Sequence, residues 1–361
     1  MKHRFQGGRT ALAAAALLAA ILAATGLTAA AAATGQNAFV VHNLVSDVPG
    51  LADHTDPDLV NAWGLTSSPT SPWWVADNET NVSTLYRADG SKVSLVVKVP
   101  NAPTGAVSNS SGNFVVTNGT SSGAARFLFD TEEGKILGWN PAVAPTEAVV
   151  AVDRSNVGAI YKGLAISSTE NTLYAADFHN SRVDVFDGTF HLVTNPGAFV
   201  DPNLPAGFAP FGIQNIGGQI FVSYAKQDAD AEDEIAGQGL GFVDAFDQSG
   251  TLLGRVVNRG QLNAPWGLAR APASFGPFGG DLLVGNFGNG RINAYEPQAD
   301  GSYERVDALR GDDHMPIEID GLWAIAFGKG AIANNGPTDT LFFTAGPDDE
   351  SHGLFGTIRG N

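Results

Sequence analysis

The sequence of 361 residues contains no cysteine. It therefore offers no disulfide framework, no thiolate metal site and no lipidated N-terminal cysteine, so packing alone must stabilise the fold. Basic residues are few as well: 20 Lys and Arg stand against 37 Asp and Glu, a formal net charge of −17. Such an acidic chain repels nucleic acid and anionic lipid, and we expect neither as a partner.

Long uncharged runs are absent except for one near the N-terminus. Lys2, Arg4 and Arg9 precede an uncharged run over 10–33 that ends in small residues. This order is typical of a cleaved signal peptide, although a retained membrane anchor is the alternative. Because alanine dominates the run and contributes little insertion energy, we predict a signal peptide over 1–33. The mature chain, 34–361, is then expected to be a single secreted, extracellular, monomeric domain without a membrane span.

A helical pattern of apolar residues is also missing, and the 44 glycines indicate many turns and few helices. What recurs is a strand, turn and strand unit, seen most clearly over 173–187 (LYAADFHNSRVDVFD) and again over 282–295 and 74–86. One copy cannot bury its own apolar face, so the copies must stack on one another.

The recurrence predicts an all-β fold, a six-bladed β-propeller. Six first strands align on one small residue, at Gly64, Gly105, Gly163, Gly212, Gly267 and Ala324. These residues succeed one another every 41 to 58 positions, a blade spacing with loop insertions. Blades are expected near 59–98, 103–152, 160–200, 208–258, 264–308 and 321–358. In the second blade, we assign 114–118 to the second strand and 129–137 to the link between third and fourth strands.

The last blade has three strands before the chain ends, while the strand pattern over 38–46 has no blade of its own. We therefore predict that this N-terminal strand completes the sixth blade and closes the ring, which leaves no long unpaired sheet edge.

The motif over 177–186 (DFHNSRVDVF) is similar to the NHL repeat. The mature chain also resembles an uncharacterised family of secreted bacterial propellers, through motifs at 60–64 (VNAWG), 75–78 (VADN), 224–228 (YAKQD), 241–244 (GFVD) and 343–355 (FTAGPDDESHGLF). The resemblance implies a propeller fold and no established activity.

Acidic residues gather in the loops that join second to third strands and one blade to the next. In a propeller these loops share one face, so we expect a negative channel mouth, unless the loops are polar only because they are wet. Asp228, Asp230 and Glu232 form the sharpest cluster, with a spacing that suits Ca²⁺ but does not match an EF-hand. A solvated acidic loop is the alternative.

A second candidate cation site consists of the residues that end the second strands: Asp77, Asn118, Asp177 and Asn286. Propeller lactonases hold a divalent cation with a comparable mixture of Asn, Asp and Glu, which acts as a Lewis acid on a carbonyl. Short polar side chains that cap hairpin turns are the alternative explanation.

Aromatic residues precede the small residue of the first strand in four blades: Trp63, Phe211, Trp266 and Trp323. They form either a stacking platform for a sugar or apolar ligand, or packing between blades. The histidines His179, His314 and His352 lie in mouth loops and could meet there as ligands or a general base.

Two functions follow. The first is a secreted, non-catalytic binding or scaffold module whose mouth recognises a cation, a basic envelope partner, a saccharide or another small molecule. The second is a metal-dependent hydrolase or lactonase that holds its cation at the ring of Asp77, Asn118, Asp177 and Asn286. The Gly119 to Gly123 stretch (GTSSG) is not a nucleophile elbow, because a hairpin loop and no helix surrounds it.

Overall fold

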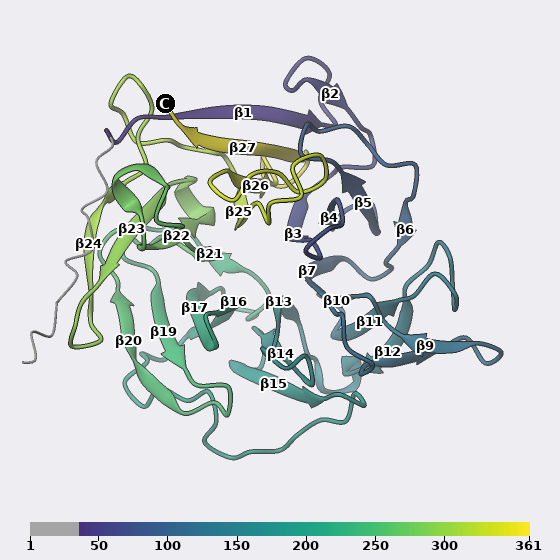
Figure 1. Cartoon of the computed structure of the whole chain (residues 1–361). Coiled ribbons are helices and arrows are strands. Elements are labelled where there is room, and N and C mark those ends of the chain that lie inside the picture. Colours follow the sequence, from purple (N-terminus) through teal and green to yellow (C-terminus); the bar gives the residue numbers. More distant parts are fainter. Residues whose placement is uncertain (1–35) are drawn as a thin grey trace, which may run out of the picture. The chain divides into compact units, whose positions relative to one another are not determined.

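The computed structural model describes residues 36–361, and the predicted signal peptide over 1–33 lies outside them. Six sheets surround a central axis as the blades of a β-propeller (Figure 1), which confirms the predicted six-bladed all-β fold. The helical turns within 36–361 are three short 3-10 helices, η1 (Ser155–Val157), η2 (Gly276–Phe278) and η3 (Phe287–Asn289). In this described part, no helix is long and apolar enough to cross a membrane.

The first three blades follow one another along the chain. Blade 1 contains β3 (Ala62–Thr66), β4 (Trp73–Asp77), β5 (Val82–Tyr86) and β6 (Val97–Lys98). Blade 2 contains β7 (Pro103–Ser108), β10 (Phe127–Thr131), β11 (Lys135–Trp139) and β12 (Val149–Asp153), with a separate hairpin of β8 (Val115–Thr117) and β9 (Ser122–Ala124). Blade 3 contains β13 (Tyr161–Ile166), β14 (Thr172–Asp177) and β15 (Arg182–Asp187).

The remaining blades continue in the same direction around the ring. Blade 4 contains β16 (Phe208–Ile216), β17 (Gln219–Gln227), β19 (Phe242–Phe246) and β20 (Leu252–Asn258), with β18 (Glu234–Ile235) paired to β17. Blade 5 contains β21 (Pro265–Arg270), β22 (Leu282–Asn286), β23 (Ile292–Pro297) and β24 (Tyr303–Ala308). Blade 6 contains β25 (Leu322–Phe327), β26 (Leu341–Ala345) and β27 (Leu354–Gly360).

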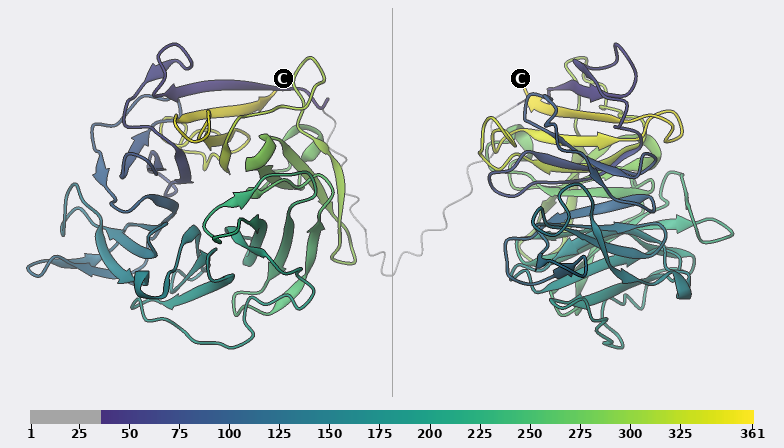
Figure 2. Two further views of the ribbon diagram at one scale, coloured as in Figure 1. Left: turned by 180° about the vertical axis from the view of Figure 1, so that it is seen from behind. Right: turned by 90° about the vertical axis from the view of Figure 1, so that its right-hand side faces the viewer.

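The N-terminal strand closes the ring as predicted. β1 (Phe39–Ser46) pairs antiparallel with β27, from Phe39 opposite Gly360 to Ser46 opposite Leu354, and β2 (His54–Thr55) adds two residues outside it. Figure 2 shows from behind how these two ends of the described chain lie side by side. Blade 6 therefore gains its fourth strand from the start of the chain, which covers the edge of β27.

In blade 2 the second strand differs from the one predicted from the sequence. The stretch over 114–118 is not the second strand, because it forms the β8 hairpin, and β10 takes its place beside β7. The turn over 132–134 then joins second to third strands rather than third to fourth. The apolar residues over 114–118 had indicated a strand, and Phe114 and Val116 of this stretch are indeed buried. Periodicity reports which face is buried and not which strand is the neighbour, so it could not separate an inserted hairpin from a blade strand.

The six small residues of the first strands lie where neighbouring blades come closest. A Cβ atom at Gly64 would overlap the carbonyl oxygen of Thr104, and one at Gly212 would overlap that of Trp266. The same holds between blades 5 and 6, where Gly267 faces the carbonyl oxygen of Trp323. The first strands thus touch backbone to backbone around the axis, and this contact sets the width of the central channel.

We expect Gly212→Ala to destabilise the protein by about 1–3 kcal/mol, because the added methyl group must push blades 4 and 5 apart. Gly254→Ala in β20 is the matched control: no atom lies within 4 Å of the place its Cβ would occupy, and its backbone is not left-handed. Urea unfolding followed by circular dichroism measures both. Equal stability of the two variants would show that the first strands do not require a small residue.

Candidate functional site in the central channel

Aromatic side chains fill the channel at the end where the first strands begin. The Trp323 ring is the hub: its centroid lies 3.7 Å from Trp63, 4.1 Å from Phe287 and 5.8 Å from Phe211. Trp63, Phe211 and Trp323 are buried, so three of the four aromatic residues considered as a stacking platform pack against one another between blades. We call this group of rings the plug.

A buried ammonium group lies directly beside the plug. Lys162 stands where other blades carry an aromatic residue, is 1 % exposed, and holds its Nζ 5.2 Å from the Trp63 ring centroid. Glu132 from blade 2 accepts a hydrogen bond from Nζ at 2.6 Å, and Asp233 from blade 4 accepts another at 3.0 Å. Lys162 therefore ties three neighbouring blades together by charge.

Two further carboxyl groups, Glu234 and Glu350, surround this ion-paired centre. Burial raises the pKa of Glu234 to about 8, an effect that Lys162 opposes. Burial likewise raises the pKa of Glu350 to about 7, and its Oε2 accepts a hydrogen bond from Asn61 Nδ2 at 2.6 Å. At neutral pH the cluster thus keeps protons that isolated carboxyl groups would have lost.

The acidic insertion over 228–234 takes part in this network through its last residues. Asp228 Oδ1 accepts the Glu232 backbone N–H at 3.0 Å, which closes the loop on itself, while Asp233 reaches Lys162. Asp230 is exposed, as is Glu232. The carboxyl groups of Glu132, Asp233, Glu234 and Glu350 lie around Lys162 at this end of the channel, and the plug fills the space beside them.

The four residues of the predicted cation ring each form hydrogen bonds to different partners. Asp77 Oδ2 accepts the Thr84 N–H at 2.8 Å. Asp177 Oδ2 accepts from Asn180 Nδ2 at 2.9 Å and forms an ion pair with Arg182 Nη2 at 3.1 Å.

The two amide residues of that ring also have local partners. Asn286 donates to the Gln261 carbonyl at 2.8 Å. Asn118 caps the β8–β9 turn by accepting from the Thr120 and Ser121 N–H groups, because its strand is not part of the blade. Within residues 36–361, no group of three or more His, Asp or Glu is placed to hold a metal ion. Asn118 and Asp177 thus cap hairpin turns, whereas Asp77 bonds to the neighbouring strand β5 and Asn286 to the loop that precedes β21.

The three mouth histidines make separate contacts. His179 Nδ1 lies 3.2 Å from the Ala231 carbonyl, and His352 Nδ1 lies 2.7 Å from Asp47 Oδ2. His314 sits in the loop that enters blade 6, where its carbonyl accepts from Arg310. The structure gives the three imidazoles no common partner.

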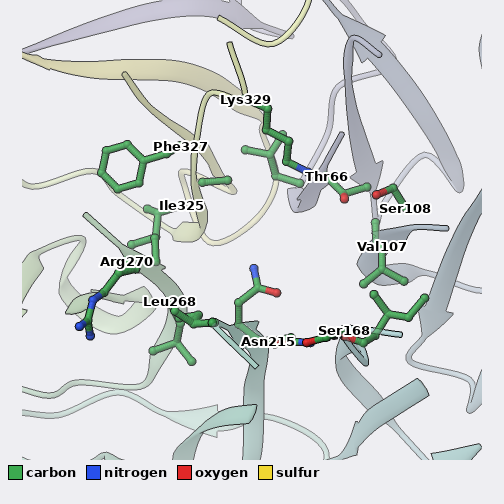
Figure 3. Close-up of a pocket in the computed structure, with 18 of the residues that line it drawn as sticks. Thr66, Val107, Ser108, Ser168, Asn215, Leu268, Arg270, Ile325, Phe327 and Lys329 are labelled. Atoms are coloured by element: carbon green, nitrogen blue, oxygen red, sulfur yellow. Dashed lines mark hydrogen bonds between the residues drawn. The ribbon is translucent and has the colours of Figure 1, made fainter. Parts of the chain in front are cut away.

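The opposite end of the channel is open. A cavity of about 670 Å³ lies there, and all six first strands contribute their last residue to its wall (Figure 3): Thr66, Ser108, Ile166, Ile216, Arg270 and Phe327. We call this cavity the funnel. The acidic loops had indicated a pocket at the other mouth, and they lie at the end that the plug fills.

The funnel narrows toward the plug. A smaller void of about 30 Å³ continues it, lined by aliphatic residues that include Leu65, Leu164 and Leu268 and by the amide of Gln214. Trp266 lines this void and donates through Nε1 to the Lys162 carbonyl at 2.7 Å. Of the four predicted aromatic residues, Trp266 thus reaches a cavity, but from the face opposite to the one expected.

Charge in the funnel differs from that of the whole chain. The charged residues in its lining are Glu170, Arg270 and Lys329. Glu170 is engaged by Ser110, which donates its backbone N–H at 2.9 Å and its hydroxyl at 2.7 Å. The lining therefore carries more basic than acidic side chains, whereas the chain has 20 basic and 37 acidic residues.

Comparison with known proteins places this architecture in a family. Uncharacterised protein R648 of Acanthamoeba polyphaga mimivirus is 34 % identical over 331 residues, which cover 88 % of this chain and 79 % of that protein. Uncharacterised protein L690 of the same virus is 33 % identical over 336 residues, covering 88 % and 85 %. The chain belongs to this family. No established family model matches the sequence.

Solved structures share the fold of this chain at low sequence identity. A Bacteroides thetaiotaomicron protein of unknown function has a TM-score of 0.56 and 11 % identity, covering 89 % of this chain and 76 % of that one. A streptogramin B lyase has a TM-score of 0.51 and 14 % identity, covering 90 % and 98 %. Identities this low support the propeller fold and carry no function.

Lys162→Met should cost about 3 kcal/mol at pH 8, because it leaves the partly buried carboxylates of Glu132, Glu234 and Glu350 without their cation. The loss should shrink toward pH 5. A carboxyl group whose folded pKa is raised stabilises the fold fully below its ordinary value of 4.5, and that stabilisation is lost as the pH rises through about 7 for Glu350 and about 8 for Glu234.

Urea unfolding of Lys162→Met at pH 5 and pH 8 tests this cluster, with Lys98→Met on the exposed part of β6 as the control of equal net charge. If the loss is the same at both pH values, the raised carboxyl pKa values do not govern the stability of this end.

Proposed function

We propose that this protein is an exported, non-catalytic binding propeller that takes a small, largely apolar molecule into the funnel. The observation that carries the proposal is the volume and position of the funnel, about 670 Å³ on the channel axis with walls from all six blades. Protein pockets for small molecules usually enclose about 300–1,000 Å³.

The chemistry of the walls supports an apolar ligand with a polar end. Leu65, Val107 and Leu268 line the cavity, and the aliphatic void beneath it continues this surface inward. Gln214 is a polar side chain of the narrow void, whereas the charged groups Arg270, Lys329 and Glu170 lie at the ends of the first strands or in the loops that follow. An apolar group that enters the narrow part loses contact with water, while a polar end stays at the rim.

The alternative of a metal-dependent hydrolase needs Asp77, Asn118, Asp177 and Asn286 to share one ion. Their hydrogen bonds instead run to separate partners: Asp77, Asn118 and Asp177 bond within their own hairpins, and Asn286 bonds to the loop that precedes β21. The geometry therefore favours binding in the funnel over catalysis at the filled end.

Export remains part of the proposal because of the N-terminal segment. Three basic residues, an uncharged run over 10–33 and small residues at its end have the composition of a signal peptide. A chain without cysteine is also compatible with an oxidising compartment, since it has no thiol to protect.

N-phenyl-1-naphthylamine, a neutral apolar dye whose emission rises in apolar surroundings, tests the funnel. The mature protein should bind it in a saturable way. Ala106→Phe should weaken binding by at least about tenfold, because Ala106 lines both the funnel and the void beneath it. A second variant, Ala326→Phe, narrows the funnel from blade 6 and should act in the same direction.

Ala229→Phe is the matched control, since it adds the same ring to the exposed insertion at the filled end. Circular dichroism confirms that each variant folds. The proposal is wrong if the native protein does not bind the dye, or if Ala229→Phe abolishes binding while both funnel variants retain it.

A further inference from the structure

The loop that follows β25 fixes a lysine in the wall of the funnel. Asn335 is fully buried and donates to the carbonyl oxygens of Ser68, Pro69 and Ser71 in blade 1, at 3.1 to 3.2 Å. Its Oδ1 accepts the Lys329 backbone N–H at 3.2 Å. This asparagine therefore pins the loop of blade 6 to blade 1 and holds the start of the Lys329 side chain in place.

The Lys329 ammonium group has no carboxylate partner among the ion pairs of residues 36–361. Its Nζ donates to the backbone carbonyl of Ser67, and the rest of the side chain is exposed into the funnel. Surrounding protein atoms lower the pKa of Lys329 through desolvation. Lys162 at the other end is the contrast, because Glu132 and Asp233 neutralise it.

Hydroxyl groups lie on the same side of the funnel as this ammonium group. Figure 3 shows the Lys329 amine turned toward Thr66, with Ser108 of blade 2 beyond it. An ammonium group flanked by two hydroxyl donors is a set of groups that recognises a carboxylate or sulfate oxygen. Arg270 adds positive charge at the rim, although its guanidinium group points away from the axis in the same view.

We propose that the ligand of the funnel is an amphipathic organic anion. This inference rests on the proposed binding function and adds the ligand's charge and orientation. Its anionic head binds Lys329, Thr66 and Ser108, and its aliphatic tail extends toward Leu65 and Leu268 where the channel narrows. The lining carries Arg270 and Lys329 against the single acid Glu170, whereas the whole chain has a formal net charge of −17, so this wall favours an anion.

Four probes with the same ten-carbon chain test the proposal: decanoate, decyl sulfate, decanol and decyltrimethylammonium, each titrated below its micellar concentration by calorimetry. Both anions should bind at least about tenfold more tightly than decanol, and the cation should bind most weakly. A preference between carboxylate and sulfate then identifies the head group.

Lys329→Met should weaken decanoate binding by about tenfold to a hundredfold and change decanol binding by less than about threefold. Thr66→Val should weaken decanoate binding about threefold to tenfold through loss of one hydroxyl donor. Lys98→Met, which changes the net charge equally but lies on the outer strand β6, should leave both affinities unchanged. Decanoate binding of the native protein should also weaken as the pH rises toward the ordinary lysine value of 10.5, because desolvation lowers the pKa of Lys329.

The outcomes separate this inference from the function on which it rests. If decanol binds as tightly as decanoate and Lys329→Met changes neither, the funnel binds apolar molecules but the anion assignment is wrong. Tighter binding of decyltrimethylammonium would contradict the assignment directly. If no ten-carbon probe and no naphthylamine dye binds, the proposed function itself fails.

Discussion

Backbone contact between neighbouring first strands is the constraint on which this structure depends. Five glycines and Ala324 let the six strands approach until main-chain atoms of one blade touch those of the next. The ring is consequently narrow at its centre, so a few large side chains are enough to fill it. Trp63, Phe211 and Trp323 do so at the end where the first strands begin. At their other end the strands diverge with the twist of the blades, and the channel opens into the funnel.

The channel has one lysine near each end, and the two lysines serve different purposes. Lys162 is buried beside aromatic rings and is neutralised by carboxylates from adjacent blades. Burying an ion pair with additional hydrogen bonds holds blades in a defined arrangement, although its net contribution to stability is modest. Lys329 has a backbone carbonyl as its partner and faces an open cavity. The first arrangement is that of a structural charge, and the second is that of a charge available to a ligand.

Membership in a family with two uncharacterised mimivirus proteins leaves the function to be argued from the site itself. The propeller scaffold positions loops at both mouths of a channel, and different proteins with this scaffold use them for unrelated chemistry. In this chain the acidic mouth is occupied by its own side chains. The opposite mouth combines volume, apolar walls and positive charge that faces the cavity, which makes it the better candidate for recognition.

The local sequence determined most of the strands, the number of blades and the closure of the ring. Each repeat encodes these features through its alternation of apolar and polar residues and through a small residue at a fixed place. The sequence also has Thr104 and Lys162 at the two positions where the other four blades carry an aromatic residue. Only the tertiary structure decided which strands pair in blade 2, and with that the place of Glu132 beside Lys162. Lys329, Thr66 and Ser108 belong to three different blades, and nothing in the spacing of their residues along the chain relates them. They share a cavity because the ring closes between blade 6 and blade 1, and such a contact depends on how distant segments meet in space rather than on any local pattern.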